Sequence, residues 1–248
     1  MADLLNHPLI AERYFYPTRV TPSSRLDIEV DGAVLSCGWH PVGDDSPTLV
    51  FFHGNGETVA SWQGIINRPI NALGWNLLLA EYRGYGASTG RPHLGELYDD
   101  VPAIIRAAGD PERTVVMGRS VGSLFAADAV KEFPNLAGLI MESGIADSME
   151  RVEMRVTRDE LGGTDDEFRA MQARLDQHPK LAGYTGPTLV MHAKHDNLVP
   201  VSHGERLAAW AGGPTTLRIF DEGDHNTIMW ENIEEYFDAL AEFLAPLR

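Results

Sequence analysis

Short apolar runs rich in β-branched and aromatic residues alternate with helical patterns along most of this sequence. The run Thr48-Leu49-Val50-Phe51-Phe52 shows no polar alternation, which is typical of a strand buried on both faces of a sheet. Strands are expected at residues 13–16, 25–30, 33–40, 48–52, 76–80, 114–117, 136–141, 188–192 and 217–220, and helices at 62–73, 97–108, 122–132, 203–211 and 233–244. This alternation predicts an α/β fold, a mostly parallel twisted sheet with helices on both faces.

The 248 residues fit a single domain spanning 1–248, and the composition is that of a globular protein. The formal net charge of −16 disfavours binding to nucleic acids and to anionic lipid surfaces, because both are negatively charged. Cys37 is the only cysteine, which excludes an internal disulfide. Neither a signal peptide nor an apolar run of roughly 20 residues is found, so a cytoplasmic protein without a membrane span is expected. No particular oligomeric state is indicated.

One long segment interrupts the alternation of strands and helices. Residues 145–186 are charged and helix-prone, with no convincing strand, and a helix is expected near 165–177. Such a segment is either a plain long connection or a small helical cap that contributes to function above a rigid scaffold. Of these two, we predict that residues 145–186 form a small helical cap.

The residues Gly118-Arg119-Ser120-Val121-Gly122 form a G-x-S-x-G pattern between an expected strand and an expected helix. A serine at the apex of such a tight turn has a strained backbone, and small residues on either side let the strand and helix approach closely. The helix N-terminus beneath the serine favours developing negative charge. The pattern therefore predicts that Ser120 is a nucleophile; the alternative is a glycine-rich turn with an idle serine.

A serine hydroxyl is a weak nucleophile unless a base takes its proton. Asp196 and His225 each follow an expected strand, which gives the chain order Ser, Asp, His of a nucleophile-elbow hydrolase. Because the carboxyl ends of parallel strands lie at one edge of a sheet, the three side chains can meet there. We expect His225 to act as general base and then general acid, and Asp196 to orient its ring. Asp221 and Asp224 lie too near His225 along the chain to take that role easily.

Acyl transfer also needs hydrogen-bond donors that stabilise the negative charge formed on the substrate carbonyl oxygen. The backbone amide of Val121, the residue after the nucleophile, is the first candidate. The second is the amide of Asn55, in the loop His53-Gly54-Asn55-Gly56-Glu57, whose glycines let N–H groups turn toward that oxygen. Only the backbone is needed, so the Asn55 side chain is expected to matter little. The alternative is an ordinary glycine turn.

Together these motifs resemble the α/β-hydrolase superfamily, and within it the lid-poor serine hydrolases of the Bem46, ABHD13 and ABHD17 kind. The residues that carry the resemblance are 53–56, 82–90, 118–122, the Asp196 loop and 224–226, and the resemblance spans about residue 13 to the C-terminus. It implies an α/β-hydrolase fold, a triad of Ser120, Asp196 and His225, and oxyanion amides at Asn55 and Val121.

The run 81–90 has two further features. Glu81 stands where family members usually have Asp, which is a small change. Arg83 lies between aromatic residues before alternating glycines, which favours a structural turn with a buried, paired arginine over substrate contact. The insertion at 145–186 matches no substrate-defining motif, so the resemblance supports the chemistry and leaves the substrate open.

We therefore expect a serine hydrolase, a carboxylesterase or thioesterase that cleaves a small-molecule ester or thioester through an acyl-enzyme without a cofactor. The alternatives are a peptidase or amidase on the same scaffold and a non-enzymatic binding protein that retains the fold. His192 and His195 beside Asp196 are plausible metal ligands, but they occupy the loop of the expected triad acid, so no metal is predicted. A short cap favours short or medium acyl chains. The side chains expected to bind substrate are Trp62, Phe125, Ile145, Met149 and Met154.

Overall fold

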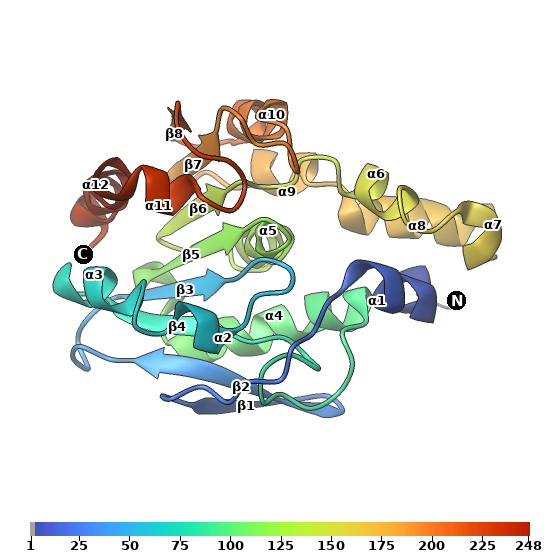
Figure 1. Ribbon diagram of the computed structural model, residues 1–248, viewed down its shortest axis with the longest axis horizontal. Coiled ribbons are helices and arrows are strands. Elements are labelled where there is room, and N and C mark those ends of the chain that lie inside the picture. The colour runs from blue at the N-terminus through green and yellow to red at the C-terminus, as the bar shows by residue number, and fades with distance from the viewer. Residues whose placement is uncertain (1–2) are drawn as a thin grey trace.

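The computed structural model describes residues 3–248, which contain an eight-stranded sheet in the order β1-β2-β4-β3-β5-β6-β7-β8 (Figure 1). β1 and β2 form an antiparallel hairpin, β2 also runs antiparallel to β4, and the other neighbouring pairs are parallel. The strands are β1 (Leu26–Val30), β2 (Ala33–His40), β3 (Thr48–Phe52), β4 (Asn76–Ala80), β5 (Thr114–Arg119), β6 (Gly138–Glu142), β7 (Thr188–Ala193) and β8 (Thr215–Phe220). The predicted mostly parallel sheet is confirmed.

Alternating side chains of the strands enter two apolar cores, one on each face of the sheet. Along β3, Val50 and Phe52 belong to one core, whereas Leu49 and Phe51 belong to the other. The first core is covered by α4 (Leu94–Ala108), α5 (Gly122–Glu132) and α10 (Ser202–Trp210), and the second by α2 (Val59–Trp62), α3 (Asn67–Ala72), α11 (Ile228–Glu231) and α12 (Ile233–Leu244). This double burial explains why the central strands carry no polar alternation.

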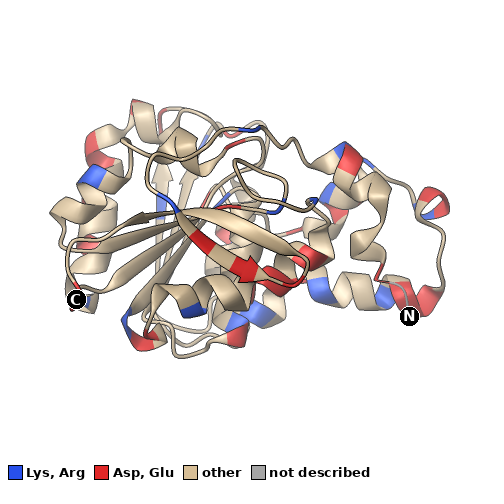
Figure 2. Ribbon diagram, turned by 90° about the horizontal axis from the view of Figure 1, so that it is seen from below, with Lys and Arg blue, Asp and Glu red and all other residues tan. Residues whose placement is uncertain are grey.

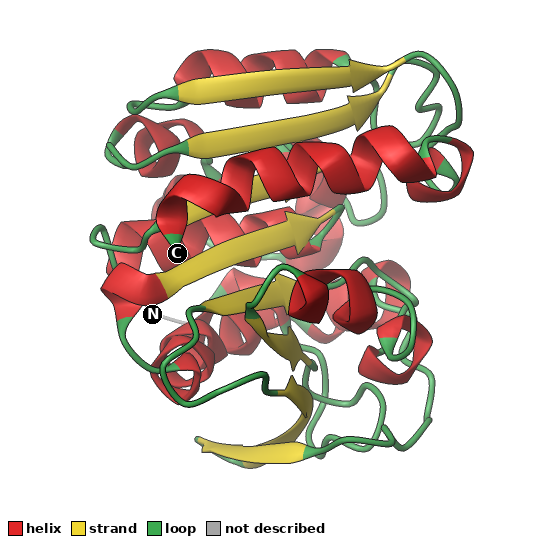
Figure 3. Cartoon of the chain, turned by 90° about the vertical axis from the view of Figure 1, so that its left-hand side faces the viewer, coloured by secondary structure: helices red, strands yellow, loops and turns green. Residues whose placement is uncertain are grey.

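The parallel strands all end at the same edge of the sheet. Their arrowheads point toward this edge in Figure 3. β3 and β5 are direct neighbours in the sheet, with Phe52 opposite Gly118. β7 and β8 are also paired, up to Ala193 and Phe220. The loops that carry the expected site residues therefore follow strand ends at this same edge.

Four helices lie between β6 and β7, within the segment 145–186. They are α6 (Ser148–Glu153), α7 (Arg158–Leu161), α8 (Asp165–Leu175) and α9 (His178–Ala182). α9 packs on α5, whereas α6, α7 and α8 lie beside the N-terminal elements η1 (Leu4–Asn6) and α1 (Pro8–Tyr14) (Figure 1). An ion pair between Arg13 and Glu160, 2.8 Å apart, joins α1 to α7.

Two predicted elements were wrong. Residues 13–16 are not a strand: Arg13 and Tyr14 end helix α1, which begins with Pro8 after the His7 side chain accepts a hydrogen bond from Leu9 N–H. The helix predicted at 62–73 is two short helices, because Gly64 lies between them with φ +88°. Helix capping at His7 explains the first difference. The left-handed conformation of Gly64 explains the second.

Charged residues of both signs are interspersed along the helices, and acidic residues colour strand β1 in Figure 2. Arg83 is buried and donates two hydrogen bonds to Asp100, from Nε at 2.6 Å and from Nη2 at 2.7 Å. The predicted buried, paired arginine is therefore confirmed. Within residues 3–248, no helix combines the length and apolar character that crossing a bilayer requires.

Candidate active site

Ser120 occupies a sharp turn between β5 and α5. Its backbone has φ +52°, a left-handed conformation that a serine adopts only when its surroundings impose it. A Cβ on Gly118 would lie 2.6 Å from Ser123 Cα, and a Cβ on Gly122 would collide with the Phe52 carbonyl. Ser120 N–H also donates to the Glu142 carbonyl at 2.9 Å. The glycines of the motif are thus required by the close approach of strand and helix.

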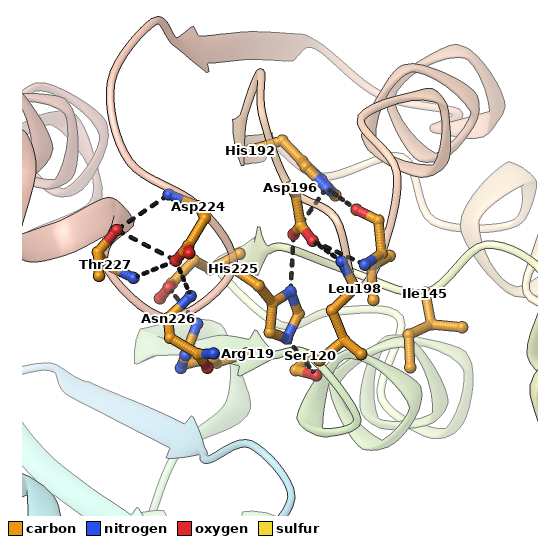
Figure 4. Close-up of polar contacts among 12 residues, drawn as sticks. Arg119, Ser120, Ile145, His192, Asp196, Leu198, Asp224, His225, Asn226 and Thr227 are labelled. Carbon is orange, nitrogen blue, oxygen red and sulfur yellow. Dashed lines mark hydrogen bonds and ion pairs between the residues drawn. The ribbon is translucent and has the colours of Figure 1, made fainter.

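The structure brings the side chains of Ser120, His225 and Asp196 into one line of hydrogen bonds (Figure 4). His225 Nε2 lies 2.9 Å from Ser120 Oγ, and His225 Nδ1 lies 2.7 Å from Asp196 Oδ2. Because an ionised carboxylate can only accept, Nδ1 carries a proton and Nε2 is left to accept the serine proton. All three residues are largely buried, and Ser120, at 9%, is the most exposed of them.

Three hydrogen bonds and one longer histidine contact converge on the Asp196 carboxylate. Leu198 N–H and Val199 N–H donate to Oδ1 at 2.9 and 2.7 Å, and His225 donates to Oδ2 at 2.7 Å. His192 Nε2 lies 3.3 Å from Oδ2 and 2.8 Å from the Val199 carbonyl oxygen. Burial raises the pKa of this carboxyl, but the contacts with His192 and His225 outweigh burial and hold its pKa well below the ordinary value. The carboxyl is therefore ionised near neutral pH.

The two nearby aspartates have other partners. Asp221 is exposed and pairs with Lys194 at 2.8 Å. Asp224 accepts hydrogen bonds from Asn226 N–H and from the Thr227 backbone and hydroxyl, which closes the turn that carries His225 (Figure 4). Asp224 is thus a turn residue, and Asp196 is the carboxylate that contacts the imidazole.

Asn55 and Val121 follow neighbouring strand ends. Phe52 and Gly118 are paired in the sheet, and each candidate amide lies three residues beyond its paired residue. Within residues 3–248, neither backbone N–H donates a hydrogen bond, so both remain available to an incoming oxygen. The arrangement suits an oxyanion hole beside Ser120.

The Asn55 side chain has a structural role that the sequence analysis missed. Its Nδ2 donates to the Tyr14 carbonyl, and its Oδ1 accepts from Tyr85 OH at 2.8 Å and from Tyr16 N–H at 3.2 Å. These bonds tie the loop after β3 to the segment that follows α1. The side chain thus holds the loop whose backbone amide is the oxyanion candidate, a structural contribution beyond the backbone role expected of Asn55.

The expected substrate-binding residues are dispersed. Phe125 is 1% exposed and packs against Phe52, Tyr82 and Tyr98 inside the core, because it lies on the sheet-facing side of α5. Met154, directly after α6, is 64% exposed, and Met149 lines a separate groove of about 460 Å³. Ile145 lies near Ser120 and Leu198 (Figure 4). The five side chains therefore do not form one pocket.

A cavity of about 190 Å³ lies next to the candidate site, with Trp62 in its wall. Arg119 and Asn226, the immediate chain neighbours of Ser120 and His225, also line it. The other lining residues are Glu57, Ser61, Ile65, Glu142, Ile228, Met229 and Trp230. Most of these residues were missed, although the apolar run at 228–230 directly after the candidate histidine is a signal that could have indicated them.

His203 anchors the start of the segment 145–186. Its Nδ1 accepts a hydrogen bond from Ala146 N–H at 3.1 Å, which a protonated ring could not do. Burial lowers the pKa of His203 to about 4, and Arg206 and Arg151 lower it further against the opposing effect of Asp147. The histidine is thus neutral in the folded protein over most of the acid range.

This lowered pKa predicts a loss of stability in acid. Between about pH 6.5, the ordinary value, and pH 4, the unfolded chain takes up a proton that the folded chain does not. The free energy of unfolding should therefore fall as the pH falls through this window. Melting temperatures of the wild type and of His203→Gln, which does not titrate, measure the effect. The wild type should lose more stability than the variant; an equal loss would contradict the prediction.

Comparison with known proteins supports the fold. Residues 47–161 match the family described as alpha/beta hydrolase fold. The chain is 26% identical over 206 residues to human alpha/beta hydrolase domain-containing protein 17B, covering 80% of this chain and 66% of that protein. It is 28% identical over 209 residues to mouse protein 17C, covering 80% of this chain and 59% of that protein. The matches thus span less than two thirds of these relatives.

Solved structures also support the fold. A Pyrococcus furiosus esterase, Pf2001, superposes with a TM-score of 0.73 at 19% identity, covering 93% of this chain and 98% of that one. Est1E from Butyrivibrio proteoclasticus, solved with ferulic acid, superposes with a TM-score of 0.74 at 19% identity, covering 90% and 98%. At these identities the likeness establishes the fold.

Proposed function

We propose that this chain, which has the α/β-hydrolase fold and resembles alpha/beta hydrolase domain-containing protein 17, cleaves carboxylic esters or thioesters with Ser120 as nucleophile. The observation that carries the proposal is the chain of contacts from Ser120 Oγ through His225 to Asp196, at 2.9 and 2.7 Å. A left-handed serine with φ +52° in contact with an imidazole has the arrangement of an activated nucleophile.

In the first half-reaction, His225 Nε2 takes the hydroxyl proton while Ser120 Oγ attacks the substrate carbonyl carbon. The carbonyl oxygen becomes negatively charged and accepts hydrogen bonds from the Asn55 and Val121 amides. Asp196 stabilises the imidazolium that forms. His225 then gives its proton to the departing alcohol or thiol, which leaves Ser120 acylated.

In the second half-reaction, water replaces the leaving group. His225 takes a proton from this water, the resulting hydroxide attacks the acyl carbonyl, and the same two amides hold the oxyanion. Collapse of the intermediate returns the proton to Ser120 Oγ and releases the carboxylic acid. Every step uses groups of this chain together with water.

The cavity beside Arg119 bears on the substrate class. It measures about 190 Å³ and combines the apolar side chains of Trp62 and Met229 with polar ones such as Asn226, and its small volume favours small groups. The structurally similar Pf2001 is an esterase, and we extend ester cleavage to this chain as part of the proposal.

A panel of substrates tests the reaction class. We expect purified protein to hydrolyse p-nitrophenyl esters and acyl thioesters of short to medium chain length much faster than the matched p-nitroanilides. Faster cleavage of the anilides would identify an amidase on the same scaffold. Folded protein that hydrolyses neither class and does not react with a fluorophosphonate would indicate a binding protein and would overturn the proposal.

A further inference from the structure

The two candidate oxyanion amides belong to different segments, the loop after β3 and the turn after β5. An oxyanion hole acts through a fixed distance between its donors, so something must hold these segments together. We propose that Glu57 and Arg119 are positioning residues that fix the loop of Asn55 against the turn of Ser120. This inference rests on the proposed function and assigns roles to two charged side chains outside the triad.

Glu57 binds its own loop with one carboxylate oxygen and the neighbouring strand end with the other. Oε2 accepts from Gly54 N–H at 2.8 Å and from Trp62 Nε1–H at 2.8 Å. Oε1 accepts from Arg119 Nε–H at 2.8 Å. A Cβ on Gly54 would lie 2.8 Å from Oε1, so a larger residue there would displace this carboxylate. The loop is thus closed around Glu57 and attached through it to β5.

Arg119 extends the attachment to two further elements. Its Nη1 donates to Glu142 Oε1 at 2.8 Å, and Glu142 Oε2 accepts from Tyr236 OH at 2.7 Å. Glu142 ends β6 and Tyr236 lies on α12. Since Arg119 directly precedes Ser120, its side chain fastens the nucleophile turn to the rest of the sheet edge. Figure 4 shows Arg119 to the left of Ser120.

The cluster is buried and its charges depend on one another. The side chains of Arg119 and Glu142 are 5% and 1% exposed. Burial lowers the pKa of Arg119, but Glu142 and Glu57 outweigh burial and raise it above the ordinary value. Burial raises the pKa of Glu57, but Arg119 and His53 outweigh burial and lower it. The charges of Arg119 and Glu57 therefore persist near neutral pH, and removing one of the two leaves the other without its partner.

Within the described residues 3–248, neither side chain forms a hydrogen bond with the triad. The partners of the Glu57 and Arg119 side chains are those named above. They can act on the reaction only by holding backbone, not by moving protons. Loss of the link should therefore lower kcat, leave KM nearly unchanged, and leave the pH dependence set by His225 unchanged.

The first test is Glu57→Gln, which keeps the shape of the side chain. A glutamine amide nitrogen cannot accept, so either Arg119 or the pair of Gly54 and Trp62 loses its acceptor. We expect kcat for a p-nitrophenyl ester to fall about 10- to 100-fold, since a misplacement of about 1 Å at a reacting site costs up to about 100-fold. KM should stay within about 2-fold. A kcat equal to that of the wild type would overturn the inference.

Arg119→Lys provides a second, independent variant. Lysine retains the positive charge but not the fork that joins Glu57 to Glu142. We expect a similar loss of kcat, and the double variant should be no slower than the slower single variant, because both substitutions break the same link. Losses that multiply in the double variant would contradict a shared positioning role.

Asp128→Asn is the matched control. Asp128 is also buried, lies on α5 and pairs with Lys180 at 3.0 Å, but far along the helix from Ser120. This variant should lower the melting temperature and keep kcat. If Asp128→Asn lowers kcat as much as Glu57→Gln, general destabilisation explains the effect and the inference fails. An inactive wild type would instead refute the proposed function, so the two failures are distinguishable.

Discussion

Ser120→Ala should lower kcat/KM for p-nitrophenyl esters by about 10⁵-fold or more, because no other hydroxyl can receive the acyl group from the same position. Ser120 Oγ is the atom that His225 Nε2 contacts at 2.9 Å. The variant should fold, since alanine tolerates the φ of +52° about as well as serine does. Steady-state kinetics on purified wild type and variant measure the loss.

Ser143→Ala is the control for this substitution. Ser143 directly follows the parallel strand β6 and also has a left-handed backbone, at φ +48°, and its hydroxyl is buried with no hydrogen-bond partner in residues 3–248. Its replacement should leave the rate within about 2-fold. A Ser120→Ala variant that retains a tenth or more of the wild-type rate would rule out Ser120 as the nucleophile.

Asp196→Asn should lower kcat by about 10⁴-fold, the loss seen when the carboxylate of a serine protease triad becomes an amide. The asparagine amide nitrogen would face His225 Nδ1, now 2.7 Å from a carboxylate oxygen. The ring would then keep its proton on Nε2 and could not accept the proton of Ser120. Single-turnover kinetics of acylation measure this effect on the step in which it arises.

Asp221→Asn is the matched control for the acid. Asp221 precedes His225 by four residues, is exposed and pairs with Lys194. Its replacement should leave acylation unchanged, since its carboxylate does not contact the imidazole. Equal losses in the Asp196 and Asp221 variants would argue against a specific role for Asp196.

Much of the fold follows from local patterns. The apolar strands without alternation, such as 48–52, predicted a sheet covered on both faces, and the two cores confirm it. The turn at Ser120 was predictable because glycines at 118 and 122 are required by backbone contacts that any such turn makes. The meeting of Ser120, Asp196 and His225 followed from strand direction, and their catalytic role stays a prediction.

The parts that sequence reasoning missed depend on contacts between distant segments. Nothing near Asn55 in the chain reveals that its side chain bonds to residues 14 and 16. Glu57 and Arg119 are 62 positions apart, and their pairing follows only from the register of β3 on β5. Phe125 was assigned to the pocket from its nearness to Ser120, but the helical rotation of α5 turns it into the core.

The central claim is that Ser120 forms a covalent bond in the course of the reaction. Incubation of the folded wild type with a fluorophosphonate, followed by intact-mass measurement and peptide mapping, tests it most directly. The account predicts one adduct per chain, located on Ser120, with esterase activity lost in proportion to labelling. An active protein that stays unlabelled, or an adduct on another residue that abolishes activity while Ser120 is unmodified, would contradict it.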